Sequence, residues 1–185
     1  IGMVLKVENS FSLTPLGRIV AEVNECNPLL MGYVIQENLL DDLEFHDIVG
    51  VLSVFIGEKH EDAPFIRDLE CRNEVKDVLN AIKDYIEDLE FKESELVNIV
   101  PYVFNSDWQF NLSIYKVISE WAKGTCVWGE VKSNYFEFFR FEGNFCRSIL
   151  RMINLLRNIE AIAVMTKRVD LVNKLRGYHE KLSRD

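Results

Sequence analysis

Residues 143–165 read GNFCRSILRMINLLRNIEAIAVM. The stretch has no proline, and apolar residues occupy most of a helical wheel, so we predict a single long helix that is mostly buried. The remaining side is a narrow polar stripe, whose members fall within about 80° of one another at the helical period. The stripe comprises Arg140, Asn144, Arg147, Arg151, Asn154 and Asn158.

The chemistry of this stripe is compatible with nucleic-acid binding. Arginine binds phosphate and stacks on bases, and asparagine hydrogen-bonds base edges. Spacing alone leaves two interpretations open, because the arginines can either pair with carboxylates of neighbouring helices or line a path for single-stranded RNA or DNA. Carboxylate partners around Arg147 and Arg151 would favour the first interpretation, and an open stripe would favour the second.

The rest of the chain predicts further helices. Thr14-Pro15 and Asn27-Pro28 each place proline after an N-capping residue, which marks two helix starts. Apolar residues from Val75 to Leu89 fall on one face of a helix of about five turns. Other helices are expected at 44–56, 112–123, 126–135 and 167–183. Sustained strand alternation is absent, so the predicted fold class is all-α, a bundle of seven or eight helices around the long central helix.

Two segments are expected outside the helices. Residues 3–7 (MVLKV) predict a short strand, and the acidic, proline-containing residues 57–64 predict a long loop. An aromatic run precedes the long helix, and we expect it to pack in the core, with stacking on bases as the alternative. The run consists of Tyr135, Phe136, Phe138, Phe139 and Phe141.

Charge is distributed unevenly along the chain. The net charge of −9 is unusual for a nucleic-acid-binding protein, which is commonly basic. Residues 141–185, however, hold nine Lys or Arg against five Asp or Glu, whereas the other 140 residues hold twelve against twenty-five. Such asymmetry indicates that acidic and basic surfaces are segregated.

The motifs of several enzyme classes are missing. The sequence has no phosphate-binding loop, dinucleotide fingerprint, zinc-protease motif or serine-hydrolase elbow, so we expect no catalytic residues and no cofactor in this chain. The four cysteines form no C-x-x-C pair, which predicts buried free thiols and no metal site. Neither a secretory signal nor a membrane-length apolar run is present, so an intracellular location is expected. The cysteines are Cys26, Cys71, Cys126 and Cys146.

Four blocks occur along the chain in a fixed order. They are Leu13-Thr14-Pro15-Leu16-Gly17-Arg18, Ile48-Val49-Gly50-Val51-Leu52-Ser53-Val54-Phe55, Glu120-Trp121-Ala122-Lys123-Gly124 and Phe141-Glu142-Gly143-Asn144. In this order they resemble the DSHCT domain, the C-terminal helical domain of superkiller-type, exosome-associated DExH-box RNA helicases. Arg184-Asp185 looks like the start of the family's closing motif, so the resemblance covers residues 13–185.

The resemblance implies a role for the long helix. In the family this helix is ratchet-like and faces an RNA channel, and two polar residues one turn apart contact RNA bases. The matching positions are Arg151 and Asn154, although the family often has an acid at the second position. Arg147 lies one turn earlier on the same stripe and is added from the helical wheel. These three residues are the expected RNA-binding residues.

The resemblance also implies a larger helicase. Its two recombinase-like domains, which use ATP and magnesium, precede the DSHCT domain and connect to it through a winged helix, of which residues 1–12 would be the tail. ATP hydrolysis would drive 3′-to-5′ translocation on RNA and feed it to an exosome-type degradation machine, while residues 13–185 guide the strand. The alternative is a protein-interaction bundle that docks helicase or adaptor domains without touching RNA.

Overall fold

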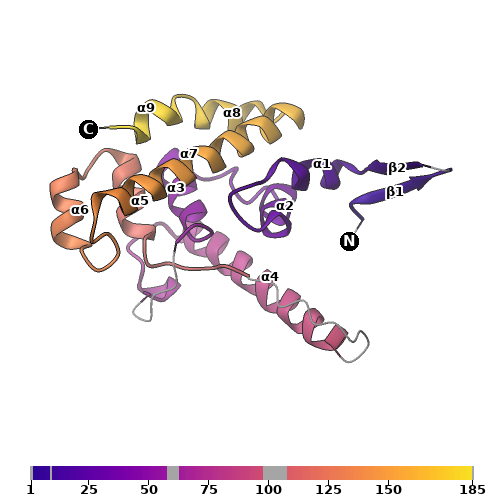
Figure 1. The fold of residues 1–185 in the computed structure, drawn as a ribbon, viewed down its shortest axis with the longest axis horizontal. Coiled ribbons are helices and arrows are strands. Elements are labelled where there is room, and N and C mark those ends of the chain that lie inside the picture. The colour runs from indigo at the N-terminus through magenta and orange to yellow at the C-terminus, as the bar shows by residue number, and fades with distance from the viewer. Residues whose placement is uncertain (1, 9, 58–62, 98–107, 185) are drawn as a thin grey trace.

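The structure of the chain is a computed structural model that describes residues 2–8, 10–57, 63–97 and 108–184. Helices predominate in these ranges, so the predicted all-α class is confirmed (Figure 1). The elements in chain order are β1 (Val4–Val7), β2 (Ser10–Leu13), α1 (Pro15–Glu22), α2 (Pro28–Gln36), α3 (Phe45–Ser53), the short 3-10 helix η1 (Ile66–Asp68), α4 (Asn73–Val97), α5 (Tyr115–Lys123), α6 (Trp128–Asn134), α7 (Glu142–Met165), α8 (Val169–Leu175) and α9 (Tyr178–Leu182).

Helices α1 and α2 begin where the sequence predicts. The side-chain oxygen of Thr14 accepts a hydrogen bond from the backbone N–H of Gly17 at 3.0 Å. Asn27 Oδ1 accepts one from the backbone N–H of Leu29 at 2.9 Å. Each cap satisfies an N–H group that has no partner inside its helix, and the following proline needs none. Local sequence therefore fixes both starts.

Helix α3 lies at the centre of the bundle. Every residue from Asp47 to Ser53 is buried, which suits a helix that is apolar on most of its faces. Helix α5 packs against α3, and the two approach closely at Gly50. A Cβ atom built at Gly50 would lie 2.7 Å from Cε2 of Tyr115 and 3.2 Å from the Cβ of Ser119. Because glycine has no side chain, α3 and α5 can approach this closely at Gly50.

Helix α7 crosses the bundle between two groups of helices. It contacts α1 and α3 on one side and α8 and α9 on the other (Figure 1). The single helix predicted for 167–183 is divided, because Gly177 adopts a left-handed conformation with φ of +73°. A residue in this conformation cannot continue a right-handed helix, so α8 and α9 are separate.

The expected strand at residues 3–7 is one half of a hairpin. Strand β1 pairs antiparallel with β2, which the sequence did not predict because its four residues are exposed and carry no buried face. The hairpin projects from the bundle at the start of α1 (Figure 1). Its base is attached there because the backbone N–H of Thr14 donates to the carbonyl of Met3 at 2.9 Å.

The four cysteines differ in their burial. Cys126 is buried and Cys26 and Cys71 are half-buried, but Cys146 is exposed, so the prediction of a buried thiol is wrong there. Cys146 lies on the side of α7 that also exposes 60% of Leu150, so α7 carries an uncovered apolar side in addition to its polar stripe.

The loop predicted at 57–64 falls mostly outside the described residues. No helix in the described ranges is long and apolar enough to cross a membrane.

Replacing Gly50 by alanine should destabilise the fold. The added methyl group would overlap the ring of Tyr115, and overpacking of this kind costs about 1–3 kcal/mol. The matched control is Gly143→Ala in α7, where nothing lies within 4 Å of the added Cβ. Alanine favours the helix there, so this variant should be neutral or up to about 1 kcal/mol more stable. Chemical denaturation followed by circular dichroism measures both, and equal stabilities would contradict the close α3–α5 approach.

Candidate nucleic-acid interface

The polar stripe of α7 is shorter than the helical wheel predicted. Helix α7 begins at Glu142, so Arg140 precedes it and does not belong to the stripe. The Arg140 guanidinium instead lies over the ring of Phe141, 5.7 Å from its centroid. The wheel placed Arg140 on the helix because it assumed helical geometry beyond the true start. The remaining members of the stripe all lie on α7.

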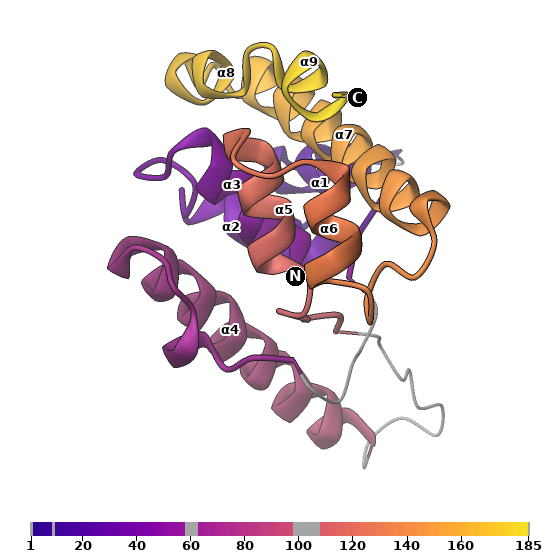
Figure 2. The same cartoon turned by 90° about the vertical axis from the view of Figure 1, so that its left-hand side faces the viewer.

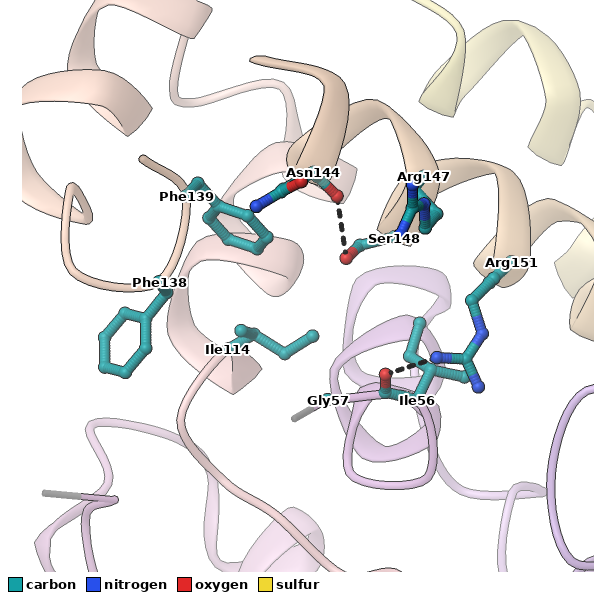
Figure 3. Close-up of a pocket in the computed structure, with 9 residues that line it drawn as sticks. All are labelled: Ile56, Gly57, Ile114, Phe138, Phe139, Asn144, Arg147, Ser148 and Arg151. Atoms are coloured by element: carbon teal, nitrogen blue, oxygen red, sulfur yellow. Dashed lines mark hydrogen bonds between the residues drawn. The ribbon is translucent and has the colours of Figure 1, made fainter. Parts of the chain in front are cut away.

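Arg151 is bound by two segments that are distant in the sequence. Its Nη1 donates to the carbonyl of Ile56, just beyond α3, at 2.9 Å (Figure 3). Its Nη2 donates to the carbonyl of Glu25, between α1 and α2, at 3.1 Å, and its Nε lies 3.6 Å from Oε2 of the same residue. The side chain keeps 35% of its surface exposed. Since a guanidinium has five N–H donors, Arg151 serves as a structural anchor and still presents an edge to solvent.

Asn154 and Asn158 continue this attachment toward the C-terminal end of α7. Asn154 Nδ2 donates to Oε1 of Glu25 at 3.0 Å. Asn158 Oδ1 accepts from the backbone N–H of Asn24 at 3.3 Å. Both asparagines are half-buried. Three successive members of the stripe therefore fasten α7 to the connection between α1 and α2.

Glu25 is the residue of this site that sequence analysis missed. Its carboxylate approaches both positions that the family resemblance singles out, Arg151 and Asn154. No local pattern reveals this, because Glu25 lies in a connection and its partners are 126 and 129 residues away. Beside it, burial raises the pKa of the Cys26 thiol to about 12, so Cys26 stays protonated at neutral pH and is a poor nucleophile.

Arg147 has a different environment from Arg151. It is exposed, and among the described residues we find no carboxylate or carbonyl that holds it. Arg147 and Arg151 flank one side of a pocket, and the opposite side is apolar (Figure 3). The residues around this pocket are Ile56, Gly57, Ile114, Phe138, Phe139, Asn144, Arg147, Ser148 and Arg151. Within it, the Ser148 hydroxyl donates back to the carbonyl of Asn144 at 3.2 Å.

The aromatic run ahead of α7 only partly fulfils the expectation of core packing. Phe139 is buried and packs edge-to-face on Phe145, with ring centroids 5.1 Å apart. Tyr135 and Phe138 are half-buried, whereas Phe136 and Phe141 are exposed. The run lies in the connection between α6 and α7. One side of this connection faces solvent, so only part of the run is buried.

The stripe thus combines both arrangements that the sequence left open. Arg151 has an internal carboxylate partner, as the first interpretation expected, while Arg147 is open, as the second expected. Chemically, Arg147 offers an unbalanced positive charge suited to phosphate, and Arg151 and Asn154 offer hydrogen-bonding groups beside it.

Comparison with known protein families adds an independent finding. The family model of the DSHCT (NUC185) domain matches residues 10–185, which is nearly the whole chain. Among curated proteins, no sequence match is found. The match agrees with the ordered sequence blocks and with the helical fold. The chain therefore belongs to the DSHCT family, whose domain occurs in superkiller-type DExH-box helicases.

Proposed function

We propose that this chain guides single-stranded RNA along α7 as the accessory domain of an ATP-dependent DExH-box RNA helicase, in RNA processing or exosome-linked decay. The observation that carries the proposal is the exposed guanidinium of Arg147, which lies one turn from Arg151 and lines the same pocket. Family membership connects the domain as a whole with helicases.

The three stripe residues would have different tasks. Arg147 would bind an RNA phosphate, because its charge is not offset by a neighbouring carboxylate among the described residues. Arg151 would contribute its exposed edge while its other donors hold Ile56 and Glu25. Asn154 would offer a hydrogen bond to a base or ribose. The contact is therefore small, and guidance of the strand suits it better than tight binding.

The energy-consuming chemistry would belong to other domains of the helicase. ATP and magnesium would bind the recombinase-like domains, to which the hairpin β1–β2 would connect as the tail of a winged helix. The role of this chain would be to position the strand while those domains hydrolyse ATP. Exosome-associated proteins would be the recipients of the RNA.

A second candidate function is protein docking, and helix α4 favours it. This helix carries eight acidic residues against three lysines. Its distal part exposes 62% of Phe91 and 54% of Leu96. Figures 1 and 2 show α4 projecting from the other helices. An acidic helix with exposed apolar residues would suit a basic protein surface, in a helicase domain or in an adaptor.

Substitution of Arg147 by alanine should weaken RNA binding without affecting the fold. Affinity for RNA falls as salt rises, and the slope of log affinity against log salt should become less steep by about 0.7 when one phosphate contact is lost, the value expected for single-stranded nucleic acid. Affinity should fall about equally for RNAs of different sequence, because phosphate contacts carry no sequence information. Fluorescence anisotropy with labelled oligonucleotides over a salt series measures both effects.

Arg157→Ala is the matched control for this experiment. Arg157 is also an exposed arginine on α7, but it lies off the polar stripe. Its removal changes the net charge equally and should leave the slope nearly unchanged. If the two variants lose the same affinity and slope, binding follows overall charge and the α7 stripe is not the RNA path. Absence of RNA binding by the wild-type chain would favour protein docking.

Substitution of Arg151 by alanine should reduce both stability and RNA response. It leaves the carbonyls of Ile56 and Glu25 without their donor, which costs about 1–3 kcal/mol of unfolding free energy. In the helicase that contains this chain, RNA-stimulated ATP hydrolysis should also fall at temperatures where the variant is folded. Denaturation curves and ATPase assays separate the two effects. Wild-type ATPase in a folded variant would show that Arg151 is only an anchor.

A further inference from the structure

We infer that Glu25 is a positioning residue that fixes the side-chain amide of Asn154, so that Asn154 presents a hydrogen-bond acceptor to RNA. Asn154 thereby selects a hydrogen-bond donor group on the nucleotide. The inference rests on the proposed function, because it assumes that RNA passes along α7. It gives Glu25, which lies outside the stripe, a role at the interface, and it identifies the contacted RNA group as a hydrogen-bond donor.

The orientation of the Asn154 amide follows from the chemistry of its partner. An ionised carboxylate only accepts hydrogen bonds, whereas an asparagine amide has one donating and one accepting end. Since Glu25 Oε1 lies 3.0 Å from Asn154, the nitrogen Nδ2 must face it. The oxygen Oδ1 therefore points away from Glu25, and no donor to Oδ1 is found among the described residues. Rotating the amide would place two acceptors in contact.

Glu25 is itself held firmly enough to impose this orientation. Its Oε2 lies 3.6 Å from Nε of Arg151, and its backbone carbonyl accepts from Nη2 of the same arginine. Its side chain is only 25% exposed. Carboxylate, guanidinium and amide thus form one connected network in which each group restricts the others. Arg151 and Asn154 consequently meet a ligand in a preset arrangement.

Asn158 provides an internal comparison one turn further along α7. Its Oδ1 accepts from the backbone N–H of Asn24, so its amide is oriented in the opposite sense. Asn158 therefore keeps both Nδ2 donors for a ligand, whereas one of the two acceptor positions of its Oδ1 is already used. The two asparagines look equivalent in the sequence, yet the α1–α2 connection gives them opposite hydrogen-bonding character.

An acceptor at Asn154 recognises a donor on the nucleotide. Single-stranded RNA offers two such groups near its backbone and base edges, the ribose 2′-hydroxyl and the exocyclic amine of a base. Both would satisfy Oδ1, and only the first distinguishes RNA from DNA. The shared chemistry is a neutral donor beside a phosphate bound by Arg147.

The test compares three short single strands of equal length and charge by anisotropy: oligoadenylate, its 2′-O-methyl analogue, and an oligomer of purine riboside. The second lacks the hydroxyl donor and the third lacks the amine donor. Wild-type chain should bind one analogue about 3- to 10-fold more weakly than oligoadenylate, the usual effect of one neutral hydrogen bond. The weakened analogue identifies the donor.

The variants assign this penalty to particular residues. Asn154→Ala should abolish it, and Glu25→Ala should reduce it to less than half because the amide is then free to rotate. Glu25→Gln should keep it, since the glutamine carbonyl still accepts from Asn154 Nδ2. Asn158→Ala, the matched control, should also keep it. Melting curves for each variant show the temperature range in which it is folded, and binding is compared at a temperature at which Glu25→Ala is folded.

Other outcomes overturn the inference in distinguishable ways. Equal binding of all three strands by the wild-type chain, or a penalty that survives in Asn154→Ala, would show that Asn154 reads no donor. A full penalty in folded Glu25→Ala would remove the positioning role of Glu25. If RNA binds with the Arg147-dependent salt slope in these cases, the proposed function stands. If the wild-type chain does not bind oligoadenylate at all, the proposed function and this inference fail together.

Discussion

Three segments that are far apart in the sequence meet at the guanidinium of Arg151. The carbonyl of Ile56 lies 95 residues away and that of Glu25 lies 126 residues away. A planar group with several donors can satisfy both carbonyls and face a carboxylate at once, which lysine cannot do with the same geometry. This side chain therefore helps to fix the position of α7 relative to α3 and to the connection between α1 and α2. The fold and the candidate interface share it.

The sequence predicts well whatever depends on neighbouring residues. The capping of α1 by Thr14 and of α2 by Asn27 is local, and the long helix α7 follows from its apolar periodicity. The same periodicity overestimates burial, because it cannot say which other elements cover each face. Cys146 is exposed for this reason. Arg140 was placed on the helix because a wheel does not show where the helix begins.

Predictions that need distant contacts fail or remain incomplete. The stripe on α7 is visible in the sequence, but its division between the held Arg151 and the open Arg147 depends on Glu25 and Ile56. The interruption at Gly177 would require knowing that this glycine takes a left-handed conformation, although glycine often remains within predicted helices at modest cost. Tertiary contacts decide all of these features.

The uneven distribution of charge along the sequence corresponds to a separation of charges in space. Many of the acidic residues lie on α4, which projects away from the other helices (Figure 2). At physiological ionic strength, exposed charges interact weakly beyond about 8 Å. Acidic residues on the outer part of a projecting helix therefore reduce the attraction of α7 for an anionic strand less than the net charge suggests. The carboxylate that matters locally is that of Glu25.

The helices behind α7 have a mechanical consequence. Leu171 and Leu175 of α8 are buried in the shared core. The indole N–H of Trp121 in α5 donates to the carbonyl of Leu182 in α9 at 2.9 Å, and the Arg184 guanidinium lies over the same indole ring. Helix α7 packs against both α8 and α9, which support it on this side. A sideways load on α7 would therefore be shared with α8 and α9, and through α9 with α5, so α7 would resist bending.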